Sequence, residues 1–243
     1  MPAGLQIQND SGILQVDECF KSMVLTQKGS VVLGRPNFMG INPYQQASYA
    51  TIPYPVSARQ PVLALRSPVK VCYLTTDTGF NVFGVQNYVG ATVEYFIFDQ
   101  VGFGGGPGNI GLQVWDSAGA EVFNSSNNYM KVLSAYSVDL VVSDVGNPPT
   151  VPTYSGAAPS GRKVAVCMGV QSTGYFVQGA GTSTQPVAII RYWQCQCITP
   201  TDNTFILSNS VIQQFGGPIT ARPGLSGAIS PYNSGLILDV TGY

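Results

Sequence analysis

Apolar and polar residues alternate along much of the chain, a pattern typical of strands whose two faces meet different surroundings. Residues 91–99 (ATVEYFIFD) and 187–198 (VAIIRYWQCQCI) are the clearest examples. Glycine, proline, asparagine and aspartate separate most segments of this kind, as turns between strands require. The best helical candidate, residues 207–215, is short. The pattern predicts an all-β fold with long irregular loops and little helix.

A repeat is the most informative feature of the pattern. Residues 4–12 (GLQIQNDSG) return as residues 111–119 (GLQVWDSAG), and residues 21–25 (KSMVL) return as residues 129–133 (YMKVL). Each copy predicts a β-hairpin, because an aspartate side chain bonds nearby backbone groups in a turn and glycine adopts positive φ. The predicted turn residues are Asp10, Gly12, Asp116 and Gly119.

The second copy of the repeat follows a segment that breaks regular structure. Residues 101–109 (VGFGGGPGN) contain five glycines and a proline, which indicates a connection or an exposed loop. We therefore predict an N-terminal β-sandwich-like domain at 1–100, a Gly-rich connection at 101–109 and a C-terminal β-sandwich-like domain at 110–243. The alternative is a long loop within one continuous fold.

Tyrosines occur in two proline-rich stretches. Residues 36–61 indicate an irregular excursion, and residues 146–161 (GNPPTVPTYSGAAPSG) indicate a long surface loop. Tyrosine offers a large contact area at low entropic cost, so these rings are candidates for receptor or partner contact. The alternative is that they cover the edges of the sandwich. The candidate contact residues are Tyr44, Tyr49, Tyr54 and Tyr154.

Composition excludes several kinds of chemistry. The chain of 243 residues contains no histidine, which excludes relays and metal sites that depend on it. Only 9% of residues are charged and the net charge is −1, so no nucleic-acid partner is predicted. Residues 102–108 match no phosphate-binding loop, and residues 224–228 (GLSGA) do not complete a nucleophile elbow. We predict no catalytic residue and no cofactor.

Most carboxylates stand beside turn residues, which accounts for them without catalysis. Glu94 and Arg191 are exceptions, since each falls inside a strand and needs a partner there. We expect a structural ion pair or a subunit contact at these two positions.

The five cysteines are expected to be buried thiols, because a chain of this length does not need a disulfide framework. Cys195 and Cys197 are the one closely spaced pair, and in a strand their sulfur atoms point to one face. No second cysteine pair or histidine completes a metal site, so no metal is predicted and the role of the pair stays open. The first residues lack a secretory signal, and no apolar run is long enough to span a membrane. We expect synthesis in the cytosol.

The repeat also carries a resemblance. The opening (MPAGLQIQNDSGILQVDECFKSMVLTQKGSV), together with VEYFIFDQ and GLQVWDSAGAEVFNSSNNYMKVL, resembles small tail-associated virion proteins of tailed bacteriophages. In that family a similar Gly-Leu-x-Val and Asp-x-x-Gly hairpin stands at the start and again at mid-chain. The resemblance covers about the first 33 residues and residues 94–133. It brings no catalytic residues.

What the resemblance implies is a nonenzymatic structural component of a phage tail, at its tip, baseplate or fibre, with host-receptor contact as a further expectation. The implied partners are other tail proteins and further copies of the chain, and threefold symmetry is common in such structures. The implied location is the virion tail, after synthesis in the host cytoplasm. A surface poor in charge suits wide contacts between subunits.

Two alternatives stay open at this point. One is a β-sandwich enzyme that processes glycans with a pair of carboxylates. The other is a structural joint or decoration protein that does not touch the host.

Overall fold

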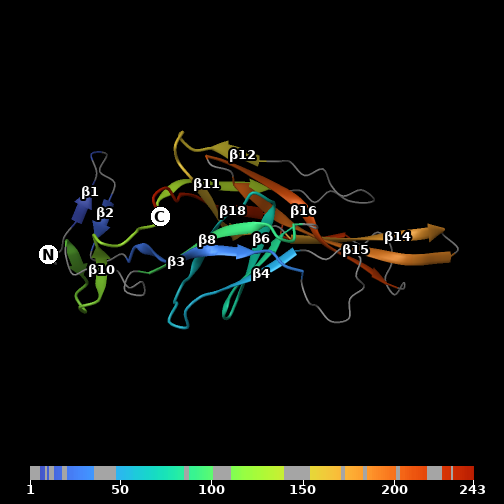
Figure 1. Ribbon diagram of the computed structural model, residues 1–243, viewed down its shortest axis with the longest axis horizontal. Helices are drawn as coiled ribbons and strands as arrows, with labels where there is room; N and C mark the ends of the chain where they lie inside the picture. Colours follow the sequence, from blue (N-terminus) through green and yellow to red (C-terminus); the bar gives the residue numbers. More distant parts are fainter. Residues whose placement is uncertain are drawn as a thin grey trace.

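The computed structural model describes residues 6–8, 10, 14–17, 21–35, 48–84, 88–100, 111–139, 154–170, 173–182, 185–200, 203–217, 226–230 and 232–243. All regular elements among these residues are β-strands, and none is a helix, which confirms the all-β prediction. Two large sheets pack face to face, two small hairpins lie at one end, and a long arm of strands projects from the other end (Figure 1).

Six strands form the first large sheet, in the order β11-β18-β13-β5-β8-β3, and all neighbours are antiparallel. The strands are β3 (Met23–Val32), β5 (Val62–Arg66), β8 (Thr92–Gln100), β11 (Val132–Asp139), β13 (Val164–Val170) and β18 (Tyr232–Asp239).

Eight strands form the second large sheet, in the order β12-β16-β15-β6-β7-β4, with β14 beside β15 and β17 beside β14. The strands are β4 (Ser48–Pro53), β6 (Val71–Thr76), β7 (Gly79–Gly84), β12 (Tyr154–Ala157), β14 (Thr173–Thr182), β15 (Gln185–Pro200), β16 (Thr204–Gly217) and β17 (Ser226–Ser230).

The main core lies between these two sheets and follows from the alternation in the sequence. In β8, Val93 and Ile97 join the core between the sheets, whereas Phe96 and Phe98 belong to a second apolar cluster on the outer face of the six-stranded sheet. This second cluster explains why both faces of the segment are apolar. Its buried members are Ala64, Phe96, Phe98, Ala165, Cys167, Leu238 and Val240.

Each large sheet contains one set of strands from each half of the chain, and the two sets are arranged in the same order. In the six-stranded sheet, the first half contributes β3, β8 and β5, in order from one edge to the centre. The second half contributes β11, β18 and β13, in order from the other edge to the centre. In the eight-stranded sheet the corresponding sets are β4, β7, β6 and β12, β16, β15. The two halves of the chain therefore share one topology, and they meet where β5 pairs with β13 and β6 pairs with β15.

Individual hydrogen bonds repeat as well. The amide of Tyr54 donates to the carbonyl of Thr78 in the first half, and the amide of Ala158 donates to that of Asn203 in the second. Four residues further along, the amide of Ala58 donates to the carbonyl of Pro55, and the amide of Arg162 donates to that of Pro159. The molecule is thus an internal duplication that extends well beyond the repeated hairpins.

Six strands of each half take corresponding places, and both large sheets contain strands from each half. The central strand of each set pairs with the central strand of the corresponding set from the other half, β5 with β13 and β6 with β15. The predicted connection, residues 101–109, lies outside the described residues.

Three local expectations were wrong. Strand β4 lies inside the stretch predicted to be irregular, and β12 lies inside the predicted surface loop. Both are short edge strands with few large apolar residues, so their pairing with β7 and β16 decides their conformation. The helical candidate at residues 207–215 is part of β16, where pairing with β15 overrides the helical spacing.

Where side chains are described, three glycines stand directly opposite an aromatic residue whose ring lies over the glycine. A side chain at Gly235 would meet a backbone group as well, because its Cβ would lie 2.2 Å from the carbonyl oxygen of Cys167. The pairs are Gly29 with Tyr95, Gly235 with Tyr136, and Gly156 with Phe205.

We predict that Gly235→Ala lowers the free energy of unfolding by about 2 kcal/mol, since backbone cannot move aside in a packed sheet. Urea unfolding followed by fluorescence measures the change. Gly34→Ala is the matched control, because its Cβ would lie 3.7 Å from the nearest atom, an ordinary contact. Equal effects of both substitutions would contradict the close approach at Gly235.

We also predict that the two halves stay together after the chain is cut between them. A specific protease site placed within residues 101–109 would separate the halves covalently, while their shared sheets and core still hold them. Size exclusion should give one peak that contains both fragments, and denaturant should be needed to resolve them. Separation of the fragments in native buffer would contradict the shared architecture.

Candidate interaction surfaces

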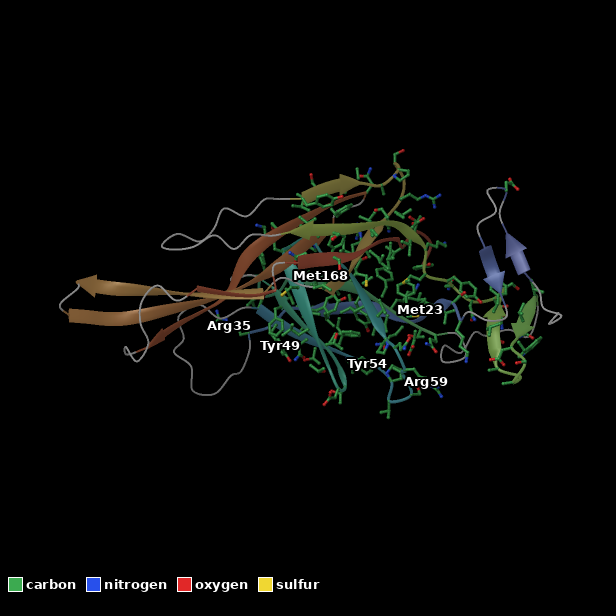
Figure 2. All side chains as sticks on the ribbon, turned by 180° about the vertical axis from the view of Figure 1, so that it is seen from behind. Met23, Arg35, Tyr49, Tyr54, Arg59 and Met168 are labelled. Atoms are coloured by element: carbon green, nitrogen blue, oxygen red, sulfur yellow. The ribbon has the colours of Figure 1, made fainter. Side chains whose placement is uncertain are left out.

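The repeated hairpins form a distinct unit, which we call the hairpin end. Strands β1 (Gln6–Gln8) and β2 (Leu14–Asp17) make one antiparallel pair, and β9 (Gln113–Trp115) and β10 (Glu121–Asn124) make the other. Both lie at the same end of the molecule, outside the two large sheets (Figures 1 and 2). The predicted pair of hairpins is confirmed.

The turn of the second hairpin has the geometry expected of its sequence. The Asp116 carboxylate accepts hydrogen bonds from the amides of Ala118 and Ala120, at 2.9 and 2.8 Å. Gly119 has a φ of 78°, which favours glycine. In the first hairpin, Asp10 is an exposed turn residue and Gly12 lies outside the described residues.

The second hairpin has a small core of its own. Val114 and Val122 are 7% and 1% exposed, although two strands alone bury little surface. Phe123 stacks on Tyr129 with ring centroids 4.9 Å apart. The Tyr129 hydroxyl accepts a hydrogen bond from the amide of Asn124 and donates one to its carbonyl. These contacts tie the hairpin to the segment that follows it.

Residues 128–130, which follow the second hairpin, pair with residues 23–25, which follow the first. We call this pairing the seam. The amide of Leu25 donates to the carbonyl of Asn128 at 2.7 Å, and the amide of Met130 donates to that of Met23 at 2.9 Å. The residues paired are those that follow each hairpin in the sequence repeat. The seam therefore connects the hairpin end to the outer face of the six-stranded sheet.

Tyr243 closes the second apolar cluster beside this seam. Its ring packs against Phe96 and Phe98, and its hydroxyl donates to the carbonyl of Tyr129. The Lys131 ammonium lies 5.0 Å from the centre of the ring, a cation–π contact. Burial, together with the negative charge of Asp239, raises the pKa of Tyr243 to about 12, so the hydroxyl remains a donor at neutral pH.

Two buried aspartates occupy equivalent places in the two halves, near the end of β8 and of β18. Asp99 accepts hydrogen bonds from the amides of Arg59 and Gln60, just before β5. Asp239 accepts from the Arg162 guanidinium at 2.8 Å, just before β13. Each carboxylate thus holds the turn that leads into a central strand, which is a structural role.

The in-strand carboxylate Glu94 has the expected structural partner. Glu94 pairs with Arg66 at 3.1 Å, on neighbouring strands of the six-stranded sheet. Arg191 lies in β15, and its side chain is outside the described part. The carboxylate pair needed by a glycan-processing enzyme gains no support from these contacts.

The candidate contact tyrosines do not form one surface. The Tyr49 hydroxyl donates to Asn81 and that of Tyr54 donates to the carbonyl of Thr76, so both half-buried rings are held by their own sheet (Figure 2). Tyr154 is 40% exposed on β12, at the opposite edge of the eight-stranded sheet from β4. Tyr44 lies outside the described residues.

The cysteines give no sign of a metal centre in the described part of the chain, where no group of three potential ligands is found. Cys72 and Cys167 are buried as expected, and burial raises the pKa of the Cys167 thiol to about 11. Cys195 and Cys197 both belong to β15, which agrees with the strand predicted for them, and their side chains lie outside the description.

The two halves differ most in the arm that projects from the sandwich. Strands β6 and β7 have six residues each, whereas their counterparts β15 and β16 have 16 and 14. Strands β14 and β17 extend this second pair into a four-stranded ribbon, in the order β17-β14-β15-β16. The ribbon points away from the hairpin end (Figure 1).

Comparison with known proteins gives no relative of this chain. No family model, no curated protein and no solved structure matches it. In the described residues, no helix is long and apolar enough to cross a membrane.

Sequence reasoning missed the full extent of the duplication, although a signal was present. Residues 76–80 (TDTGF) and 201–205 (TDNTF) are a second repeated motif. Phe80 and Phe205 from these motifs are both buried in the core between the sheets. Their spacing differs from that of the hairpins, because the second half contains the additional arm.

Acid should weaken the fold through Asp239. Burial alone would raise the pKa of this carboxyl, but hydrogen bonds from Thr241 and the charges of Arg162 and Lys131 outweigh it and lower the pKa. A lowered pKa means that the ionised group stabilises the fold above the unfolded-state pKa of about 4, and that this contribution is lost as pH falls through the folded-state value.

We therefore predict that Asp239→Asn lowers the free energy of unfolding by about 2 kcal/mol at pH 7 and makes it less sensitive to acid below about pH 4. Urea unfolding at several pH values measures both effects. Glu94→Gln, which removes a half-exposed partner, is the control and should have a small effect. An unchanged acid response in Asp239→Asn would contradict the assignment.

Proposed function

We propose that this chain is a nonenzymatic structural component of a bacteriophage tail, attached through its hairpin end. The supporting observation is the position of the two hairpins that carry the family resemblance. They form a unit at one end of the molecule, and the arm projects at the other end (Figure 1). A molecule with two different ends is suited to join a tail at one end and to reach outward with the other.

The chemistry of the described residues is compatible with a structural role. The two buried aspartates hold turns, and Glu94 is used in an ion pair. The turn of the second hairpin accounts for Asp116. In the sequence of residues 173–230, which includes the arm strands, the three charged residues are Arg191, Asp202 and Arg222. A surface this poor in charge favours contacts with other proteins.

Host contact is proposed for the arm, and subunit contact for the exposed edge that carries Tyr154. The arm is the part added to the second half, so it can vary without disturbing the repeated scaffold. Tyr154 is the described candidate tyrosine with the largest exposure, as a partner contact requires.

Electron microscopy of the phage particle whose genome encodes this chain tests the proposal. We expect density for the two-sheet body on the tail tip, baseplate or fibre, with the hairpin end toward the tail and the arm outward. Mass spectrometry of purified particles provides the control for presence. Absence of the chain from particles, or density on the head, would overturn the proposal, and an arm buried within the tail would overturn host contact.

A further inference from the structure

No described strand pairs with the outer edge of β11. Among the described residues, β11 pairs with β18 alone, so its other side presents unpaired backbone groups. Residues 131–137 are all exposed except Tyr136, and they include Val132 at 49% and Leu133 at 38% exposure. An exposed strand of this kind is a template for another strand.

The opposite side of the sandwich is protected. There, β3 carries the exposed Lys28, and β4 ends at Pro53, which has no amide proton to donate. Gly34 and Tyr49 exchange two backbone hydrogen bonds of 2.8 and 2.9 Å, and this bridge joins the end of β3 to the outer edge of β4. The two edges of one molecule are therefore unlike each other.

The residues of β11 suit pairing with a second copy of the same strand. Residues 132–138 (VLSAYSV) contain no charge and no proline, while Lys131 precedes them and Asp139 ends the strand. In an antiparallel pairing centred on Ala135, Lys131 of each copy is placed opposite Asp139 of the other. Small residues at the centre and opposite charges at both ends make the strand complementary to itself.

We propose that two copies of this chain associate through β11, as an antiparallel pair about a twofold axis. The six-stranded sheet then continues from one copy into the other. The same kind of contact already joins the two halves within the chain, where β5 pairs with β13. Strand β12 is the edge strand of the second sheet in the same half, and residues 154–157 (YSGA) carry no charge that would oppose a second copy.

Light scattering coupled to size exclusion, over about 1–200 µM of the full-length protein, tests this contact. We expect a concentration-dependent dimer. Ala135→Lys places two ammonium groups opposite each other at the axis, so the dissociation constant should rise at least about tenfold. Ser30→Lys, at an exposed position of β3, is the matched control and should leave it unchanged.

Exchanging the charges of Lys131 and Asp139 distinguishes an effect on dimerisation from an effect on folding. Lys131→Asp should weaken the dimer, because it places two carboxylates together at each end of the paired strands. Adding Asp139→Lys to the same chain should restore it. Lys131 also contacts Tyr243, so Lys131→Asp can lower stability; the double variant retains that loss and differs only in the charge at Asp139.

A monomer at all concentrations would overturn the proposal. So would an oligomer of any size that Ala135→Lys leaves intact, or a failure of the double variant to recover dimerisation while circular dichroism shows it to be folded. These outcomes leave the tail assignment untouched, because they concern only the contact between copies.

Discussion

Both large sheets depend on one hydrophobic core to which each half contributes. Each half supplies three strands to the six-stranded sheet, and the second half adds β14 and β17 to its three counterparts of β4, β7 and β6 in the other sheet. The halves meet at short central pairings between β5 and β13 and between β6 and β15. Tyr73 reaches across at this junction, with its hydroxyl 2.9 Å from the carbonyl of Leu63 and 2.8 Å from that of Met168. Burial raises the pKa of Tyr73 well above its ordinary value, so its hydroxyl stays neutral.

The duplication separates a repeated two-sheet scaffold from an additional arm within one chain. The equivalent strands, with the aspartates that hold equivalent turns, form the two-sheet body. The hairpin is present in both halves, and the seam between residues 23–25 and 128–130 ties its two copies to that body. Among the described residues, β14 and β17 of the arm have no counterpart in the first half.

Much of the fold was predictable from the sequence. The all-β class, the paired hairpins and most strands follow from alternation and from turn residues such as Asp116 and Gly119. Strands β4 and β12 were missed because few large apolar residues mark them, and residues 207–215 have helical spacing that pairing overrides. Contact residues were the hardest to predict, since a tyrosine in the sequence does not indicate whether its hydroxyl is held by a neighbour. Tyr49 and Tyr54 are held in this way, and Tyr154 is more exposed.

The sequence by itself determined the strand-forming character of the chain and the repeated hairpins, because alternation and turn chemistry act over a few neighbouring residues. It also determined that histidine-dependent chemistry is absent, since composition alone decides that point. Only the tertiary structure decided that the two halves share both sheets, because the pairing of β5 with β13 joins residues about a hundred positions apart. Only the tertiary structure decided that no described strand pairs with the outer edge of β11 while the Gly34–Tyr49 bridge joins the end of β3 to β4, since the neighbours of an edge depend on which segments the fold brings beside it.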